Sequence, residues 1–140
     1  MKKVKLAIIA LLGFMAGIAQ AQKLAAEKVP AAVKTSFAKE YPGVSKVSWE
    51  MEKGKYEAGF HQNGHAMSAL FEPNGSMTES EMQIKVSELP AAVLTSLKAK
   101  HPNAKVTEAA KITKANGEVQ YEAEVKGKDL IFDSKGNLIP

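Results

Sequence analysis

The chain has 140 residues, of which 45% are apolar and 24% are charged, and it contains no cysteine. This composition is typical of a globular protein, and the missing cysteine excludes disulfides, thiolate metal sites and thiol nucleophiles. All 19 cationic residues are lysines. Because arginine is the side chain that best binds phosphates and guanine edges, we expect no nucleic-acid partner.

The first 21 residues have the pattern of a secretory signal peptide. Three lysines among the first five residues precede an apolar run over 6–18, and Ala19-Gln20-Ala21 presents small residues where a signal peptidase cleaves. The apolar run is shorter than the roughly 20 residues that cross a bilayer. We therefore predict cleavage after Ala21, a periplasmic or extracellular location, and no stable membrane insertion of the processed chain.

The rest of the chain contains an internal repeat. The segment Val29-Pro30-Ala31-Ala32-Val33 recurs as Leu89-Pro90-Ala91-Ala92-Val93, and Tyr56-Glu57-Ala58 recurs as Tyr121-Glu122-Ala123. Three glycines of the first half also correspond to three of the second: Gly54, Gly64 and Gly75 to Gly117, Gly127 and Gly136. The sequence predicts a single domain over 22–140 that is built from two repeats, 29–82 and 89–140.

Each repeat begins with a predicted helix. Pro30 and Pro90 suit the first helical position, and Pro42 and Pro102 end the helix about three turns later. Side chains that recur every four residues line one face of each helix: Val33, Phe37 and Tyr41 in the first, and Val93, Leu97 and His101 in the second. This face must pack against another element.

A hairpin follows in each repeat, and its loop determines the register. With Asn63-Gly64 as a two-residue loop, Tyr56 opposes Phe71 on an apolar face, while Glu57 opposes Leu70 on a polar face. With Lys126-Gly127 as the second loop, Tyr121 opposes Phe132, and Glu122 opposes Ile131 on the polar face. This register separates apolar from polar side chains, as a half-buried antiparallel sheet requires.

A strand before each hairpin, over 44–51 and 104–112, and one after it complete each repeat. The predicted fold class is α+β: a tandem repeat of a helix plus a four-stranded antiparallel meander, with the helices on one face of the sheet. Trp49 shares its strand face with Val47 and Met51, so we expect it in the core.

Several of these segments resemble the PepSY-like proteins with a β-lactamase-inhibitor-type fold, exported mainly by bacteria of the Bacteroides group. The resemblance is carried by Val29-Pro30, Tyr41-Pro42, Trp49-Glu50, Tyr56-Glu57-Ala58-Gly59-Phe60 and Phe71-Glu72 before Asn74-Gly75. It implies tandem helix-and-sheet units whose open sheet face meets a protein partner, with inhibition of a peptidase or hydrolase as the suspected role. It brings no catalytic residues. The second repeat is expected to have Glu108 where the first has Trp49.

Two groups of side chains could suggest a metal site. His61 and His65 have the spacing of a zinc-binding pair, but the hairpin register sends them to opposite faces, so we predict no metal ligands there. An acidic group is predicted on the outer face of the second hairpin, with Glu124 opposite Asp129: Glu118, Glu122, Glu124, Asp129 and Asp133. Solvated charge is the favoured interpretation. Screening by lysines such as Lys111, a bound cation such as calcium, or a register break near the turn are the alternatives.

No motif of an enzyme occurs, so we predict a non-enzymatic protein without a cofactor. The favoured hypothesis is an exported module that binds another envelope or secreted protein through the open sheet face. The candidate contact residues are Glu57, Leu70, Glu122 and Ile131, since both repeats have an apolar residue beside a glutamate there. The alternatives are an enzyme of unknown type and a carrier of a small hydrophobic ligand or lipid. The carrier would use space left by Ala58, Ala69 and Ala123 beneath the helices.

Overall fold

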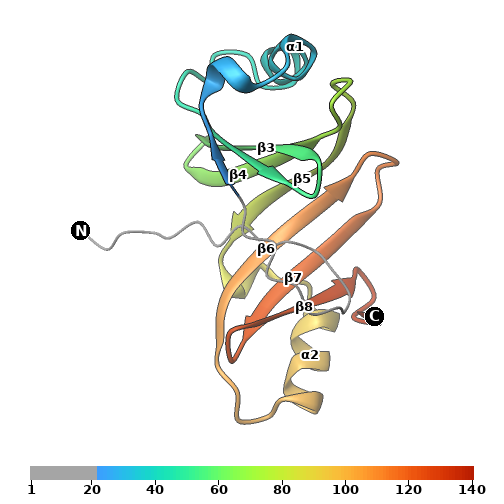
Figure 1. The fold of residues 1–140 in the computed structure, drawn as a ribbon. Helices are drawn as coiled ribbons and strands as arrows, with labels where there is room; N and C mark the ends of the chain where they lie inside the picture. Colours follow the sequence, from blue (N-terminus) through green and yellow to red (C-terminus); the bar gives the residue numbers. More distant parts are fainter. Residues whose placement is uncertain (1–21) are drawn as a thin grey trace, which may run out of the picture.

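A computed structural model describes residues 22–140, and Figure 1 shows the fold. The predicted signal peptide, residues 1–21, lies outside the described residues. Within residues 22–140, nine strands form one antiparallel sheet whose order in space is their order in sequence. The predicted α+β class is confirmed.

The element order is one helix followed by four strands, twice, after one short N-terminal strand. The helices are α1 (Ala31–Glu40) and α2 (Ala91–Lys100), each preceded by a short 3₁₀ helix, η1 (Ala26–Lys28) or η2 (Val86–Glu88). The strands are β1 (Gln22–Leu24), β2 (Ser48–Glu52), β3 (Lys55–Gln62), β4 (His65–Phe71), β5 (Met77–Ile84), β6 (Val106–Lys114), β7 (Val119–Val125), β8 (Lys128–Asp133) and β9 (Leu138–Ile139). Strand β1, which pairs with β2, was not among the predicted elements.

The two helices begin and end almost where the prolines predict. Pro30 and Pro90 lie one residue outside the helices, as extended N-cap residues, rather than at the first helical position. Tyr41 and His101 are the C-caps, and each donates its backbone N–H to the carbonyl four residues earlier. Proline is tolerated at a helix start because its missing N–H has no partner there in any case.

The predicted hairpin registers are confirmed residue by residue. Asn63 and Gly64 have φ of 51° and 80°, and Lys126 and Gly127 have φ of 54° and 72°. Two consecutive left-handed residues are what a two-residue hairpin loop of this kind needs. Tyr56 accordingly pairs with Phe71, and Glu122 with Ile131. The loops thus decide which side chains share a face.

Helix α1 packs on an aromatic core. Its Phe37 ring lies 5.0 Å from the Phe60 ring and 5.6 Å from Trp49, measured between centroids. The predicted core position of Trp49 is confirmed, with 6% of the residue exposed. Helix α2 covers a mainly aliphatic core instead, which contains Leu89, Val93, Leu97, Ala109, Ala123, Val125 and Phe132.

The second-half equivalent of Trp49 is Ala109, so the prediction that Glu108 occupies this place is wrong. Trp49 pairs with Ala58 on β3, and Ala109 pairs with Ala123 on β7. The ladder between β6 and β7 shifts between Val106 and Glu108. The offset of 60 residues that takes Val29 to Leu89 and Tyr41 to His101 also takes Trp49 to Ala109, so a count from the helix agrees with the ladder.

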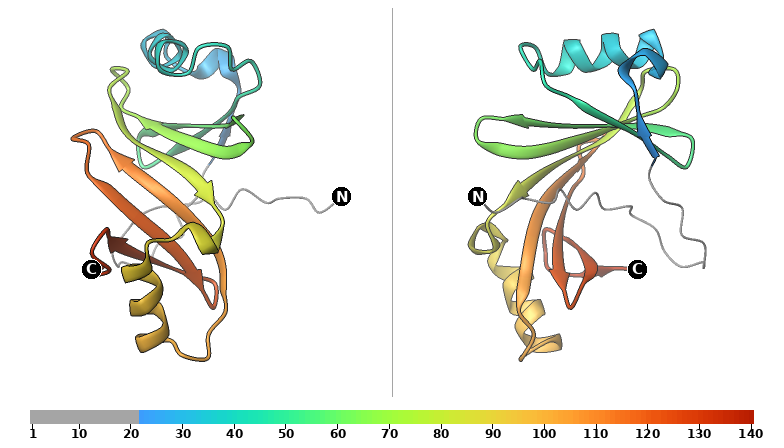
Figure 2. Two further views of the ribbon diagram at one scale, coloured as in Figure 1. Left: turned by 180° about the vertical axis from the view of Figure 1, so that it is seen from behind. Right: turned by 60° about the vertical axis from the view of Figure 1, so that its left-hand side comes forward.

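Both helices lie on the same face of the sheet, at opposite ends of the molecule (Figures 1 and 2). Strand β5 joins the two halves and demonstrates the shared face. Its Met77 packs against the core beneath α1, and its Ile84 packs against the core beneath α2. Side chains of alternate residues on β5 therefore point away from both helices, toward the second face of the sheet.

Candidate functional site: an acidic sheet face

The face of the sheet opposite the helices is strongly acidic, and we call it the acidic face. Cross-strand pairing assigns ten of the chain's fifteen carboxylates to it. They extend over six strands of both halves, β2, β3 and β5 to β8: Glu50, Glu52, Glu57, Glu79, Glu81, Glu108, Glu122, Glu124, Asp129 and Asp133. Acidic side chains are therefore concentrated on one side of the protein, although residues 22–140 contain 16 lysines against 15 acidic residues.

Only three lysines of the described strands share this face, and two of them already have a carboxylate partner. Lys55 forms an ion pair of 2.9 Å with Glu72, and Lys114 forms one with Glu79. Lys111 pairs with Tyr121 and faces the helices, so it does not screen the acidic group of the second hairpin. Glu124 does lie opposite Asp129, so the register does not break near the turn.

The four predicted contact residues all lie on the acidic face. Glu57 is directly paired with Leu70 on β4, and Glu122 is directly paired with Ile131 on β8. Leu70 and Ile131 are half-buried. The two glutamates are buried, with 7% of Glu57 and 1% of Glu122 exposed. The structure therefore places the four residues on one surface while withdrawing both carboxylates from water.

Burial changes the protonation of these glutamates. Desolvation, followed by the nearby charge of Glu81, raises the pKa of Glu122 to about 9. Desolvation also raises the pKa of Glu57 to about 7, with a further contribution from Glu50. A charged carboxylate in a poorly hydrated place without a cation is unfavourable, so Glu122 retains its proton at neutral pH, whereas Glu57 is about half ionised there. For Glu122, the interpretation as solvated charge is wrong.

Two residues of this face were not predicted, and both lie near the junction between the halves. Glu81 on β5 is half-buried, and desolvation together with Glu57 raises its pKa to about 8. Gln120 on β7 is 7% exposed. Their alternation with apolar residues is visible in the sequence, but only the pairing of β5 with β6 brings Glu81 next to the second half.

The carboxyl of Glu122 and the amide of Gln120 are incompletely hydrogen-bonded. Oε2 of Glu122 and Oε1 of Gln120 are buried and accept no hydrogen bond. The Nε2 atom of Gln120 donates to Oε1 of Glu118 at 2.9 Å, which orients the amide. Buried polar atoms are nearly always paired, so two unpaired acceptors two residues apart on one strand face are exceptional.

Within residues 22–140, no group of three or more histidine or acidic side chains has an arrangement that could hold a metal ion. His65 is directed to the backbone, with Nδ1 lying 3.0 Å from the carbonyl oxygen of Gln83. His61 pairs with Ala66 and lies on the acidic face, whereas His65 pairs with Gln62 on the helix face. The two histidines do not come together.

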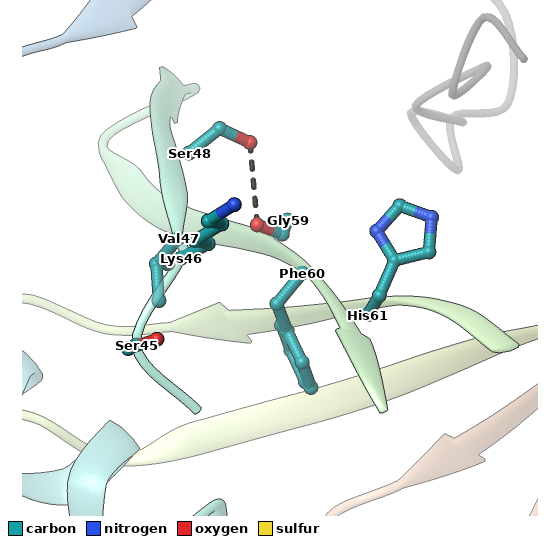
Figure 3. Close-up of a pocket in the computed structure, with 7 residues that line it drawn as sticks. All are labelled: Ser45, Lys46, Val47, Ser48, Gly59, Phe60 and His61. Carbon is teal, nitrogen blue, oxygen red and sulfur yellow. Dashed lines mark hydrogen bonds between the residues drawn. The ribbon is translucent and has the colours of Figure 1, made fainter. Parts of the chain in front are cut away.

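A pocket of about 520 Å³ lies beside His61, at the edge of β2 and β3 (Figure 3). It is open to solvent, and Lys46 and Phe60 are among its lining residues. The Ser48 hydroxyl donates to the carbonyl of Gly59 at 3.3 Å, and no acidic side chain lines the pocket. A hydroxyl that is donated to the backbone, without a carboxylate to orient a base, does not make an activated nucleophile.

The space beneath α1, where a carrier would hold its ligand, is filled by aromatic rings. Phe37 contacts the rings of Tyr41, Trp49, Phe60 and Phe71. The alanines that the carrier hypothesis invoked are buried below these rings or below α2, with Ala58 and Ala123 both 0% exposed. The carrier hypothesis stays a prediction, and the packing of the first half gives it no support.

A family model described as beta-lactamase-inhibitor-like, PepSY-like matches residues 17–78 and 54–140. The chain belongs to this family. The two overlapping matches together cover residues 17–140, and the overlap, 54–78, contains the first hairpin. Membership in the PepSY-like family agrees with the resemblance that the sequence motifs indicated.

Three solved structures of Bacteroides proteins share the PepSY-like fold of this chain. A "putative periplasmic" protein of Bacteroides eggerthii is 22% identical, with a TM-score of 0.74 over 80% of this chain and 86% of that one. A DUF2874 family protein of Bacteroides uniformis is 21% identical, with a TM-score of 0.73 over 79% and 86%. A BLIP-like protein of Bacteroides fragilis is 24% identical, with a TM-score of 0.67 over 79% and 84%.

None of the curated proteins matches the chain. In the part of the chain that the structure describes, neither helix has the length and apolar character that crossing a membrane requires.

Proposed function

We propose that this chain is an exported, non-enzymatic module that binds another envelope or secreted protein through its acidic face. The observation that carries the proposal is the separation of charge: ten carboxylates on the sheet face opposite the helices, with three lysines among them. A surface of this size with one sign of charge attracts and orients a partner of the opposite sign.

The family description supports the same role. It is beta-lactamase-inhibitor-like, which favours an enzyme as the partner, and we propose a peptidase or another hydrolase. The "putative periplasmic" description of the Bacteroides eggerthii protein supports a location outside the cytoplasm for this chain as well. Cleavage after Ala21 would release residues 22–140, which contain every helix and strand of the described fold.

The half-buried apolar residues of the acidic face provide the contact that charge alone lacks. Leu70 is flanked by Glu57 and Glu79 on the neighbouring strands, and Ile131 lies beside Glu122. Apolar contact at the centre of an interface, surrounded by polar groups, is where binding energy concentrates. We expect these two side chains to be covered in the complex.

The test is capture of a partner on immobilised residues 22–140 from periplasmic and culture fractions of the source organism. The Leu70→Gln, Ile131→Gln variant removes both apolar contacts without adding charge beside the glutamates. Leu138→Gln is the matched control, because Leu138 is 41% exposed and pairs with Phe132 toward the helix face. We expect the control to retain the partner and the double variant to lose it while keeping its fold by circular dichroism.

Equal retention by the two variants would contradict binding through the acidic face. Hydrolysis of a substrate by the purified chain, lost on a single substitution, would contradict the non-enzymatic part of the proposal.

A further inference from the structure

Two side-chain oxygens of the acidic face, one of Gln120 and one of Glu122, have no hydrogen-bond partner. Oε1 of Gln120 and Oε2 of Glu122 are both buried, belong to residues at least nine-tenths buried, and accept no hydrogen bond. The two side chains leave β7 on the same face. Each lacks a partner, and a buried polar atom left without one costs about 1 to 3 kcal/mol.

The groups around Glu122 make a positively charged donor the matching one. Glu108 on β6, Glu81 on β5, Asp129 on β8 and Glu124 on β7 itself all act on its carboxyl, and all are acidic. Lys114 is the one lysine of β6 on this face, and it is engaged by Glu79. Thus no described cation lies against Glu122.

A metal ion does not fit these atoms, since the described residues contain no group of three or more acidic or histidine ligands arranged to hold one. A guanidinium or ammonium group does. It brings several N–H donors at once, so that a single side chain can satisfy a carboxylate and a neighbouring amide oxygen. The apolar stem of such a side chain needs apolar neighbours, and Ile131 is directly paired with Glu122.

The carboxyl of Glu122 is covered in the unbound chain, with 1% of Glu122 and 3% of its β6 neighbour Ala110 exposed, so a cation reaches it only if the side chain turns outward. The neighbour of Glu122 on that strand is Ala110, whose side chain is a single methyl group. A glutamate side chain has three rotatable bonds, so its carboxyl can turn toward an arriving cation without movement of the backbone.

We propose that the acidic face recognises a basic side chain of its protein partner, an arginine or a lysine that binds between Glu122 and Gln120. This inference rests on the proposed function and adds the chemistry of the partner: the segment that enters the face is cationic, with a basic residue as its anchor.

Proton release on binding distinguishes a basic side chain bound at Glu122 from general attraction between opposite charges. With its pKa raised to about 9, Glu122 holds a proton at pH 7 when no partner is bound. An arriving cation favours the ionised form, so the proton leaves as the cation binds. Affinity for the cation should therefore rise as the pH rises from 7 toward 9. Glu122 is ionised in about one molecule in a hundred at pH 7 and in about half of the molecules at pH 9, so the rise is at most about 50-fold.

The probe is a blocked peptide with three arginines separated by serines, compared with the same peptide carrying citrulline in place of arginine. Citrulline keeps the shape of arginine and removes its charge. Isothermal titration of residues 22–140 at pH 7 in phosphate and in Tris gives the protons released per peptide bound. We expect release approaching one proton with the arginine peptide, and no binding of the citrulline peptide.

Glu122→Gln should abolish most of the proton release and weaken binding at pH 9 by tenfold or more. Glu124→Gln is the matched control, because it removes the same charge from the same strand and face at a half-buried residue. Equal weakening by the two variants, or unchanged proton release in Glu122→Gln, would overturn the anchor. Calcium chloride that binds to the parent chain and displaces the arginine peptide would overturn it too.

Failure of the anchor and failure of the acidic face have different outcomes. If Leu70→Gln, Ile131→Gln loses the captured partner and Glu122→Gln retains it with unchanged affinity, the face binds a protein but not through a basic anchor. If all three substitutions leave capture unchanged and the arginine peptide does not bind, both proposals fail.

Discussion

The two halves of the molecule use one backbone plan with different side chains in their cores. The ring of Phe37 in α1 contacts four other aromatic rings, whereas Leu97 of α2 lies among valines, alanines and leucines with Phe132 as the one buried ring. The register of the first hairpin is nevertheless repeated in the second. Loop geometry and the alternation of apolar residues therefore determine the fold here, while the choice between aromatic and aliphatic packing is free.

On the acidic face the two halves agree where their cores differ. Glu57 beside Leu70 occupies the same place as Glu122 beside Ile131. A buried glutamate is a costly residue in a sheet, because its charged form loses hydration and its neutral form needs donors. Packing needs no such residue, so its presence in both halves favours a role in binding.

The largest expected effect comes from the two helices. Phe37→Ala should lower the free energy of unfolding by about 4 kcal/mol and Leu97→Ala by about 3 kcal/mol, because the larger ring leaves the larger cavity and loses contacts with four rings. Both residues are buried, at 5% and 4% exposed. Chemical denaturation of residues 22–140, followed by circular dichroism and by Trp49 fluorescence, measures the two losses.

One transition is expected in both variants, with the two probes coinciding, because β5 and β6 join the halves into a continuous sheet. If α2 unfolds in Leu97→Ala before Trp49 fluorescence changes, the halves are separate folding units. Each substitution then reports the stability of its own half only.

A glycine of each half approaches the first turn of its helix, and this contact gives the second largest effect. A Cβ atom on Gly136 would lie 2.4 Å from the carbonyl oxygen of Ala92, and one on Gly75 would lie 2.6 Å from that of Ala32, whereas Gly127 has open space around it. All three have positive φ. Gly127→Ala should cost about 1 kcal/mol for its conformation alone, and Gly136→Ala about 3 kcal/mol because the backbone of α2 must also move.

Thermal unfolding of these glycine variants, with Gly75→Ala as a further comparison, checks the ranking. A loss in Gly136→Ala no greater than in Gly127→Ala would show that the helix adjusts at little cost.

The buried glutamates should make the protein less stable as the pH rises. Their carboxyls have raised pKa values in the folded chain, so between about pH 4.5 and these values the folded state holds protons that the unfolded state has released. The slope of stability against pH is then negative. At pH 8, Glu122→Gln should raise the free energy of unfolding by roughly 1 to 3 kcal/mol, and Glu57→Gln by less, because its pKa is only about 7.

Denaturation at pH 5, 7 and 9 measures this dependence. At pH 5 the two variants should be close to the parent chain, since both glutamates are already neutral when folded. A parent chain that is more stable at pH 9 than at pH 5 would contradict the burial of these carboxyls in the absence of a partner.

Local sequence patterns predicted the registers because short loops with Asn63-Gly64 or Lys126-Gly127 determine which residues oppose each other. The same patterns could assign Glu122 to a face but could not show its burial, which depends on how β5, β6 and β8 lie around β7. The sequence did not predict Glu81 as a site residue, because only the pairing of β5 with β6, which are separated by α2 in the sequence, places it beside the second half. The match of Trp49 to Ala109 is present in the sequence, because the offset of 60 residues between the two helices also takes residue 49 to residue 109.

The smallest expected effect distinguishes an ion pair at the junction of the halves from one within the first half. Lys114 and Glu79 join β6 to β5, with side chains 26% and 17% exposed, whereas Lys55 and Glu72 are 36% and 39% exposed. Screening by water weakens the more exposed pair, so double-mutant cycles with Lys→Met and Glu→Gln should give a coupling of about 1 kcal/mol at the junction and about 0.3 kcal/mol within the first half. High salt should remove the smaller coupling first. Equal couplings would mean that water screens the Lys114–Glu79 pair as strongly as the Lys55–Glu72 pair. Lys114 would then not be held by Glu79 and could screen other carboxylates of the acidic face.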